Sequence, residues 1–207
     1  MSDEAHHHLA TSDPRFTELI ARSPRYEPQR KRGLRPFDAL AESIVYQQLS
    51  GKAAATIWRR VREIFGSPKF LDPEKVIATR DERLRAAGLS GNKTIALKDL
   101  AAKTLQGIVP ESRALARMTD EEIIACLTQV RGIGRWTVEM LLLFDLGRPD
   151  VWPVTDLGVQ KGLMKTFGKR KLPTPKQMMK LGEKWKPYRS AAAWYFWRAL
   201  DQPNRHD

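Results

Sequence analysis

Residues 130–156 contain the side chains whose types and spacing point most clearly to chemistry. The stretch opens with Gly132 and Gly134 in a short turn, where glycine permits a positive φ and a close approach of the main chain to a phosphate. It ends at Asp156, a carboxylate that can stabilise a positive charge or position and deprotonate a water molecule. A phosphate-binding turn followed by a single carboxylate indicates an enzyme that acts on DNA.

Each of these features also has a simpler interpretation. A Gly-x-Gly turn is common at ordinary corners between two helices, and the pattern alone does not decide between the two roles. Asp156 can be the N-cap of the helix that follows it, and the local sequence alone favours capping. If Asp156 instead faces a catalytic site, Thr155 is expected to cap that helix.

Charge and cysteine content narrow the class of protein. The 207 residues include 36 Lys and Arg against 24 Asp and Glu, a net charge of +12 that suits a polyanionic partner. The single cysteine, Cys126, rules out a disulfide framework and a cysteine-based iron–sulfur or zinc site.

No secretory signal is visible, and the longest strongly apolar run, residues 140–144, is too short to span a bilayer. We therefore expect no membrane partner and an intracellular location, in the cytoplasm or nucleoid.

Helical spacing of apolar residues runs through most of the chain, and strand-like alternation is nearly absent. We predict an all-α fold. The predicted helices cover residues 37–49, 53–65, 94–105, 135–146, 155–167, 174–185 and 189–200, with a further helix after an N-cap at Thr119. The helix over 135–146 is apolar nearly all round and should be deeply buried. The His6–His8 tract, native or left from a tag, is expected to be a floppy terminus.

The turn at residues 130–134 lies between two predicted helices and forms a helix–hairpin–helix. The N–H groups that begin the second helix favour anions, so Gly132, Gly134 and Arg135 are the predicted contacts to the DNA backbone. Carbonyl groups on the other side of the turn could hold a monovalent cation, Na⁺ or K⁺. The candidates are the carbonyls of Thr128, Val130 and Ile133.

Five motifs occur in order along the chain, and together they resemble the helix–hairpin–helix DNA glycosylase superfamily. They are Tyr46–Ser50, Gly88–Ser90 with Lys93, Val130–Thr137, Trp152–Gly158 and Trp185–Ser190. Within the superfamily the chain is most similar to the 3-methyladenine DNA glycosylase II branch, in a compact form without the N-terminal β domain. The resemblance implies a two-lobed all-α fold with a cleft between lobes formed by residues 36–148 and by residues 1–35 plus 149–207.

The resemblance also implies a reaction. Asp156 matches the catalytic aspartate, which stabilises the oxocarbenium-like sugar and positions water while an alkylated purine of the 3-methyladenine or 7-methylguanine class leaves. Bifunctional members carry a Schiff-base lysine where this chain has Trp136, and tryptophan cannot form an imine. We therefore expect a monofunctional enzyme that requires no cofactor and that can hold Na⁺ or K⁺ at the hairpin. Its expected partner is damaged double-stranded DNA, and it should act as a monomer.

Base flipping implies a pocket for the extruded base and a wedge that fills the space it leaves. The pocket candidates, each with core packing as the alternative role, are Trp136, Met140 and Trp197, with Tyr46 and Trp152 as lesser ones. Met140 stands where some relatives have an aromatic residue. Gln48, with Leu49 beside it, matches the intercalating position, and a polar helix end is the alternative. Gly88 and Ser90 are candidates for a second loop that contacts the DNA backbone.

Two other classes of function remain compatible with the sequence. One is a glycosylase for deaminated or oxidised bases, and the other is a non-catalytic helix–hairpin–helix module that only binds DNA. A lyase-active glycosylase is a third alternative, against which Trp136 argues.

Overall fold

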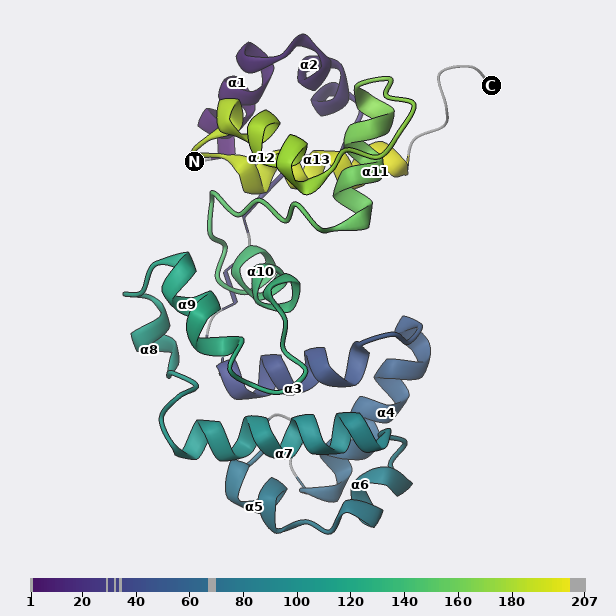
Figure 1. Ribbon diagram of the computed structural model, residues 1–207, viewed down its shortest axis with the longest axis vertical. Helices are drawn as coiled ribbons and strands as arrows, with labels where there is room; N and C mark the ends of the chain where they lie inside the picture. Colours follow the sequence, from purple (N-terminus) through teal and green to yellow (C-terminus); the bar gives the residue numbers. More distant parts are fainter. Residues whose placement is uncertain (1, 29, 32, 34, 67–69, 202–207) are drawn as a thin grey trace. The chain divides into compact units, whose positions relative to one another are not determined.

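The structure is a computed structural model that describes residues 2–28, 30, 31, 33, 35–66 and 70–201. These residues form α-helices joined by short turns, and none of them lies in a β-strand (Figure 1). The predicted all-α class is therefore confirmed.

Contacts between residues divide the chain into two compact units. The aspartate unit consists of Met1–Lys31 and Leu142–Asp207, and the hairpin unit consists of Arg32–Leu141. The sequence placed these boundaries at 35/36 and 148/149, a few residues further along the chain.

The aspartate unit packs its helices around an aromatic core. Phe16, Trp152, Trp185 and Phe196 are buried there with their rings in contact, and Tyr195 is buried in the same core. Its helices are α1 (Ser2–Ser12), α2 (Pro14–Ala21), α11 (Leu157–Thr166), α12 (Pro175–Gly182), the 3₁₀ turn η1 (Glu183–Trp185) and α13 (Arg189–Leu200).

The hairpin unit is built on one long central helix, α7 (Gly91–Leu105), which packs against α3 (Pro36–Tyr46) and α5 (Pro73–Ala78) (Figure 1). Its other helices are α4 (Gly51–Ile64), α6 (Asp81–Ala86), α8 (Ser112–Leu115) and α9 (Asp120–Leu127). Helix α10 (Arg135–Phe144) begins in this unit, and its last three residues belong to the aspartate unit.

Two helices begin at threonine N-caps. Thr119 and Thr174 both form capping boxes, in which the threonine hydroxyl accepts from the third helical N–H and that residue's side chain accepts from the threonine N–H. These reciprocal bonds satisfy donors that a helix start otherwise leaves unpaired.

Two expectations were wrong. The His6–His8 tract is not a floppy terminus but part of α1, where His6 is hydrogen-bonded to the Tyr195 hydroxyl and His8 to the Lys184 carbonyl. Helix α10 is not buried all round, because Trp136 is 46 % exposed and Phe144 is 41 % exposed. In the described part of the chain, no helix has both the length and the apolar character that a membrane crossing requires.

Candidate active site

Asp156 lies directly before α11 and is held by two hydrogen-bond donors. Its Oδ1 accepts from the backbone N–H of Val159 at 2.7 Å and from the indole Nε1–H of Trp197 at 2.9 Å. The residue is 8 % exposed. The two bonds therefore hold this buried side chain in one orientation.

The first of these bonds makes Asp156 the N-cap of α11. The expectation that Thr155 caps this helix was therefore wrong, and Thr155 is exposed. The aspartate backbone is extended, with φ −70° and ψ 119°, so its side chain can turn back to the N–H three residues on. Capping and catalysis are thus not alternatives here, since the bond that caps the helix also fixes the carboxylate.

Trp197 comes from α13, and two glycines of α11 allow it to reach Asp156. A Cβ on Gly162 would lie 1.8 Å from the Phe196 carbonyl oxygen, so the two helices approach at a distance that only glycine permits. A Cβ on Gly158 would lie 2.7 Å from the Trp197 ring. The sequence therefore positions the indole by removing side chains from the face of α11 that meets α13.

The predicted hairpin is present between α9 and α10. Gly132 adopts a left-handed φ of +79°, and a Cβ there would also meet the Ala96 Cβ at 3.3 Å. Gly134 is exposed with no atom within 4 Å of a Cβ position, and its φ is not in the left-handed region. The turn therefore requires glycine for its geometry only at Gly132. Gly134 leaves the start of α10 without a side chain.

Two residues that sequence reasoning missed hold the turn in place. Asp99 of α7 accepts the backbone N–H of Arg131 at 2.7 Å, and the side-chain amide of Gln47 donates to the Gly132 carbonyl at 2.9 Å. Burial raises the pKa of Asp99, but the Arg131 N–H and the Lys103 ammonium outweigh burial and leave its pKa below the ordinary value. Both residues are remote from the turn in sequence, so no local pattern links them to it, although Gln47 lies in the Tyr46–Ser50 motif.

Arg135 begins α10 and is occupied by carboxylates of its own unit. Its guanidinium donates to both oxygens of Glu121 and, at 3.1 Å, to Glu139. These bonds, Glu121 foremost, raise the pKa of Arg135 further. The side chain thus links the start of α10 to the first turn of α9. A phosphate would have to compete with two carboxylates for the guanidinium group.

The three carbonyls expected to hold a cation belong to this turn. The Val130 carbonyl accepts from the Ile133 N–H at 3.0 Å, which leaves its second lone pair for another partner. The described residues include no cluster of His, Cys, Asp and Glu side chains suited to a metal. The Na⁺ or K⁺ at Thr128, Val130 and Ile133 stays a prediction.

The pocket candidates divide between the two units. Trp136 and the half-buried Met140 are one turn apart and so lie on the same face of α10. Trp197 packs against Phe144 with ring centroids 5.5 Å apart. Trp152 lies in the core of the aspartate unit, where its indole N–H donates to the Met178 carbonyl at 2.8 Å, so its position is that of a packing residue. Tyr46 ends α3 and is half-buried.

The wedge candidates lie on the exposed turn between α3 and α4. Gln48 is exposed and has a φ of +56°, which is uncommon for a residue other than glycine, and Leu49 is 40 % exposed. The ammonium of Lys93 donates to the Val45 and Gln47 carbonyls at 2.8 and 2.7 Å. Lys93 therefore stabilises the end of α3 and the turn that follows it. Its ammonium group is used for these two bonds rather than for a contact with DNA.

The second backbone-binding candidate lies between α6 and α7. Gly88 has a φ of +109° and is exposed, and Ser90 caps α7 by accepting the Lys93 N–H at 3.3 Å. This turn also connects two helices through a left-handed glycine, so its geometry is compatible with the predicted contact and with a purely structural corner.

Comparison with known proteins places the chain in a family. The family of HhH-GPD superfamily base excision DNA repair proteins matches residues 41–187. This chain belongs to the HhH-GPD superfamily. The match spans the hairpin, Asp156 and the turn that precedes α13.

Relatives of this HhH-GPD chain include DNA-3-methyladenine glycosylase 1 of Schizosaccharomyces pombe, which is 38% identical over 192 residues, 92% of this chain and 84% of that protein. A structure of the S. pombe 3-methyladenine DNA glycosylase with abasic DNA superposes with a TM-score of 0.84 at 35% identity, covering 99% of this chain and 100% of that one. A DNA-3-methyladenine glycosidase from Bacillus halodurans gives a TM-score of 0.82 at 34% identity, with 92% and 86% covered. The resemblance to the 3-methyladenine DNA glycosylases is confirmed.

The described residues of this HhH-GPD protein thus form two groups, one in each unit. One joins Asp156, Gly158 and Trp197 in the aspartate unit. The other joins Gln47, Asp99 and Gly132 in the hairpin unit. The first holds a carboxylate, and the second holds an exposed turn of main chain.

Proposed function

We propose that this protein is a monofunctional DNA glycosylase that extrudes alkylated purines from duplex DNA and hydrolyses their N-glycosidic bond. The observation that carries the proposal is the Asp156 carboxylate, fixed by Val159 and Trp197 in a chain of the HhH-GPD superfamily. The names of its relatives support alkylated purines as the substrate class.

The carboxylate supplies the charge that the reaction needs. As the bond between the sugar C1′ and the base nitrogen breaks, the base leaves with the electron pair and positive charge develops on the sugar. Asp156 stabilises this charge and accepts a proton from the water whose oxygen bonds to C1′. Alkylation at N3 or N7 makes the base cationic, so it departs as a neutral molecule and no second acid is required.

Trp136 makes the enzyme monofunctional. The indole at this position of the hairpin motif offers no amine to attack C1′, so the abasic strand is left uncut. Borohydride therefore has no imine to reduce, and it should trap no covalent complex between the protein and alkylated DNA.

The hairpin unit binds the DNA backbone. The exposed start of α10 at Gly134 presents main-chain N–H groups to a phosphate, and a monovalent cation at the Thr128, Val130 and Ile133 carbonyls adds positive charge beside it. Gln48 and Leu49 fill the space left by the flipped nucleotide. A monomer acting on damaged double-stranded DNA is sufficient for all of these roles.

The experiment uses duplexes that carry one defined lesion, incubated with the purified protein and analysed for free base and for strand breaks. We expect release of 3-methyladenine or 7-methylguanine, and strand breaks only after alkali. If the protein released only deaminated or oxidised bases, these bases would be its substrates in place of alkylated purines. DNA binding without release of any base would establish the non-catalytic module instead.

A further inference from the structure

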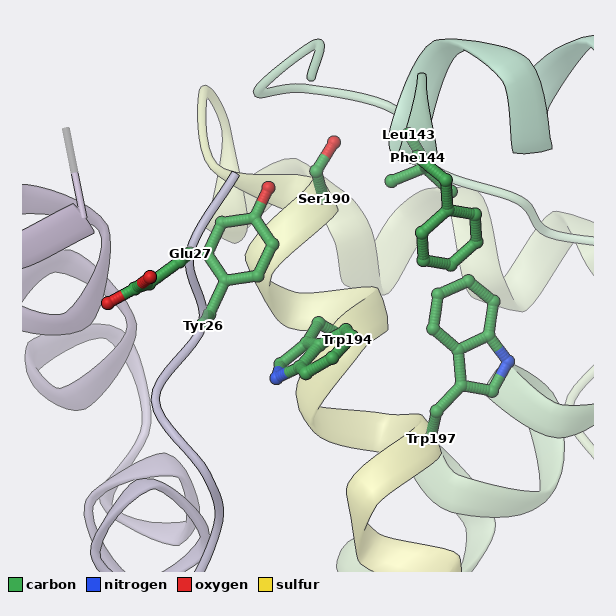
Figure 2. A pocket seen from close by; sticks show the side chains of 7 residues that line it. All are labelled: Tyr26, Glu27, Leu143, Phe144, Ser190, Trp194 and Trp197. Carbon is green, nitrogen blue, oxygen red and sulfur yellow. The ribbon is translucent and has the colours of Figure 1, made fainter. Parts of the chain in front are cut away.

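A small cavity in the aspartate unit is walled by aromatic rings. Its volume is about 110 Å³, and four rings from three segments surround it (Figure 2). The rings are those of Tyr26, Phe144, Trp194 and Trp197, and Glu27, Leu143 and Ser190 complete the lining. Trp197 is also the residue whose indole N–H donates to Asp156, so the cavity shares one lining residue with the candidate active site.

The Tyr26 hydroxyl in this wall is buried without a partner. The residue is 8 % exposed, and its hydroxyl oxygen forms no hydrogen bond with any described residue. Figure 2 shows this end of the ring pointing to the side where Ser190 lies. The Ser190 hydroxyl is already engaged, because it donates to the Arg148 carbonyl at 2.6 Å and accepts the Val151 N–H at 2.9 Å.

Such an arrangement destabilises the folded protein, since a buried hydroxyl without a partner loses its hydrogen bonds to water and gains none. Phenylalanine would fill the same space without this loss. A polar group kept in this position, in the wall of a cavity that shares a lining residue with the candidate active site, is explained if it binds a ligand.

We propose that the Tyr26 hydroxyl is a specificity-determining group that hydrogen-bonds the polar edge of the extruded alkylated purine in this cavity. The proposal rests on the proposed glycosylase function and assigns it a residue outside the motifs that carry the family resemblance.

The size and charge of the cavity suit this ligand. A cavity of about 150 Å³ accepts benzene, so a space of this order suits one ring of a purine rather than a whole nucleotide. Aromatic faces attract a cationic ring, and the Glu27 carboxylate in the lining adds negative charge. These features favour an alkylated, positively charged purine over an undamaged neutral one.

The hydroxyl can serve as either donor or acceptor. Burial raises the pKa of Tyr26 to about 12, so the phenol is protonated at neutral pH. It can donate to the O6 atom of 7-methylguanine or accept from the 6-amino group of 3-methyladenine. Because the hydroxyl donates in one bond and accepts in the other, its loss should change the release rates of the two substrates unequally.

The test compares the wild-type protein with Tyr26→Phe, and with Tyr188→Phe as the matched control, since Tyr188 lies outside the cavity lining. Single-turnover base release is measured on duplexes with 3-methyladenine and with 7-methylguanine. We expect Tyr26→Phe to change the ratio of the two rates about fivefold and to raise the Tm. The control should leave the ratio unchanged.

A binding measurement separates this inference from the proposed function. Quenching of tryptophan fluorescence reports binding of 7-methylguanosine, a cationic nucleoside, with neutral guanosine for comparison. We expect the wild type to prefer 7-methylguanosine and Tyr26→Phe to bind it about fivefold more weakly. A wild type that releases no base refutes the glycosylase function but leaves this binding test intact. An unchanged rate ratio together with an unchanged nucleoside affinity overturns the role of Tyr26, and so does a lower Tm in Tyr26→Phe.

Discussion

The turn that holds Asp156 and the turn of the hairpin are built in opposite ways. At Asp156, the backbone of α11 and the Trp197 side chain of α13 meet around a carboxylate that is 8 % exposed, and Gly158 and Gly162 have no room for a Cβ. At the hairpin, Gly132 and Gly134 are exposed, and a Cβ on Gly134 would meet nothing within 4 Å.

The difference separates two kinds of functional requirement. A group that does chemistry must be held in one orientation, which dense packing around it achieves. A turn that binds a phosphate through its main chain must instead be free of side chains on its outer face, and here Asp99 and Gln47 hold it by hydrogen bonds to its main chain. Substitutions that add bulk around Asp156 should therefore damage the fold and activity together, and those in the hairpin turn should chiefly damage DNA binding.

The largest effect on stability is expected for Gly162→Ala. The new Cβ would lie 1.8 Å from the Phe196 carbonyl oxygen, so α11 and α13 must separate. We expect the free energy of unfolding to fall by about 3 kcal/mol, at the upper end of overpacking costs, as measured by urea denaturation.

Gly134→Ala is the matched variant in the hairpin, because open space surrounds that position. It should leave the free energy of unfolding within about 0.5 kcal/mol of the wild type. Equal losses of stability in the two variants would remove the contrast between the turns.

The next largest effect is expected for Trp197→Phe. This change deletes the N–H that donates to Asp156 at 2.9 Å but keeps a ring against Phe144. Because hydrogen bonds to charged groups contribute about 1.5–3 kcal/mol, single-turnover base release should slow at least about tenfold.

Gly158→Ala sharpens this prediction, since its Cβ would displace the Trp197 ring without altering either partner chemically. The same assay should show a loss of similar size. Base release at the wild-type rate in both variants would show that the indole does not position the carboxylate.

The smallest effect is expected for Asp99→Ala beneath the hairpin. The pKa of Asp99 is below its ordinary value, so its contribution to stability is present above about pH 4 and is lost as the pH falls through the lower folded-state pKa. The variant should be about 1 kcal/mol less stable than the wild type at pH 7, and this gap should shrink below pH 4 in denaturation measured across that range.

Asp81→Ala is the control for this effect, because Asp81 pairs with Lys98 on the surface and its side chain is 50% exposed. That pair should contribute little at any pH. A gap for Asp99→Ala that stays constant between pH 7 and pH 3 would contradict the assigned role of its carboxylate.

Local patterns predicted much of this architecture. The apolar spacing of residues 189–200 predicted α13 with the bounds it has, and the N-cap predicted at Thr119 is present at the start of α9. Such features depend on side chains a few residues apart, which the sequence displays directly. The short helices α5, α6 and α8 were not predicted, because a four- to six-residue helix carries too few apolar positions to show a period.

The site was predictable only in its main residues. Gly132, Asp156 and Trp197 stand in motifs, but the bond from Trp197 to Asp156 joins residues 41 positions apart, and the support of the hairpin by Asp99 spans 32. Thr155 and Asp156 are both residue types that cap helices, and Asp156, the stronger cap of the two, is the one that caps α11. Long-range pairs of this kind appear only when the chain is folded.

The most direct test of the account is the rate of base release by Asp156→Asn under single-turnover conditions, with DNA affinity and thermal unfolding measured on the same protein. Asparagine is as good an N-cap as aspartate and can accept the same two hydrogen bonds, so only the negative charge is removed. We predict nearly unchanged folding and DNA affinity, with base release slowed at least about a hundredfold. Release at the wild-type rate would contradict the claim that the charge of this carboxylate drives the reaction.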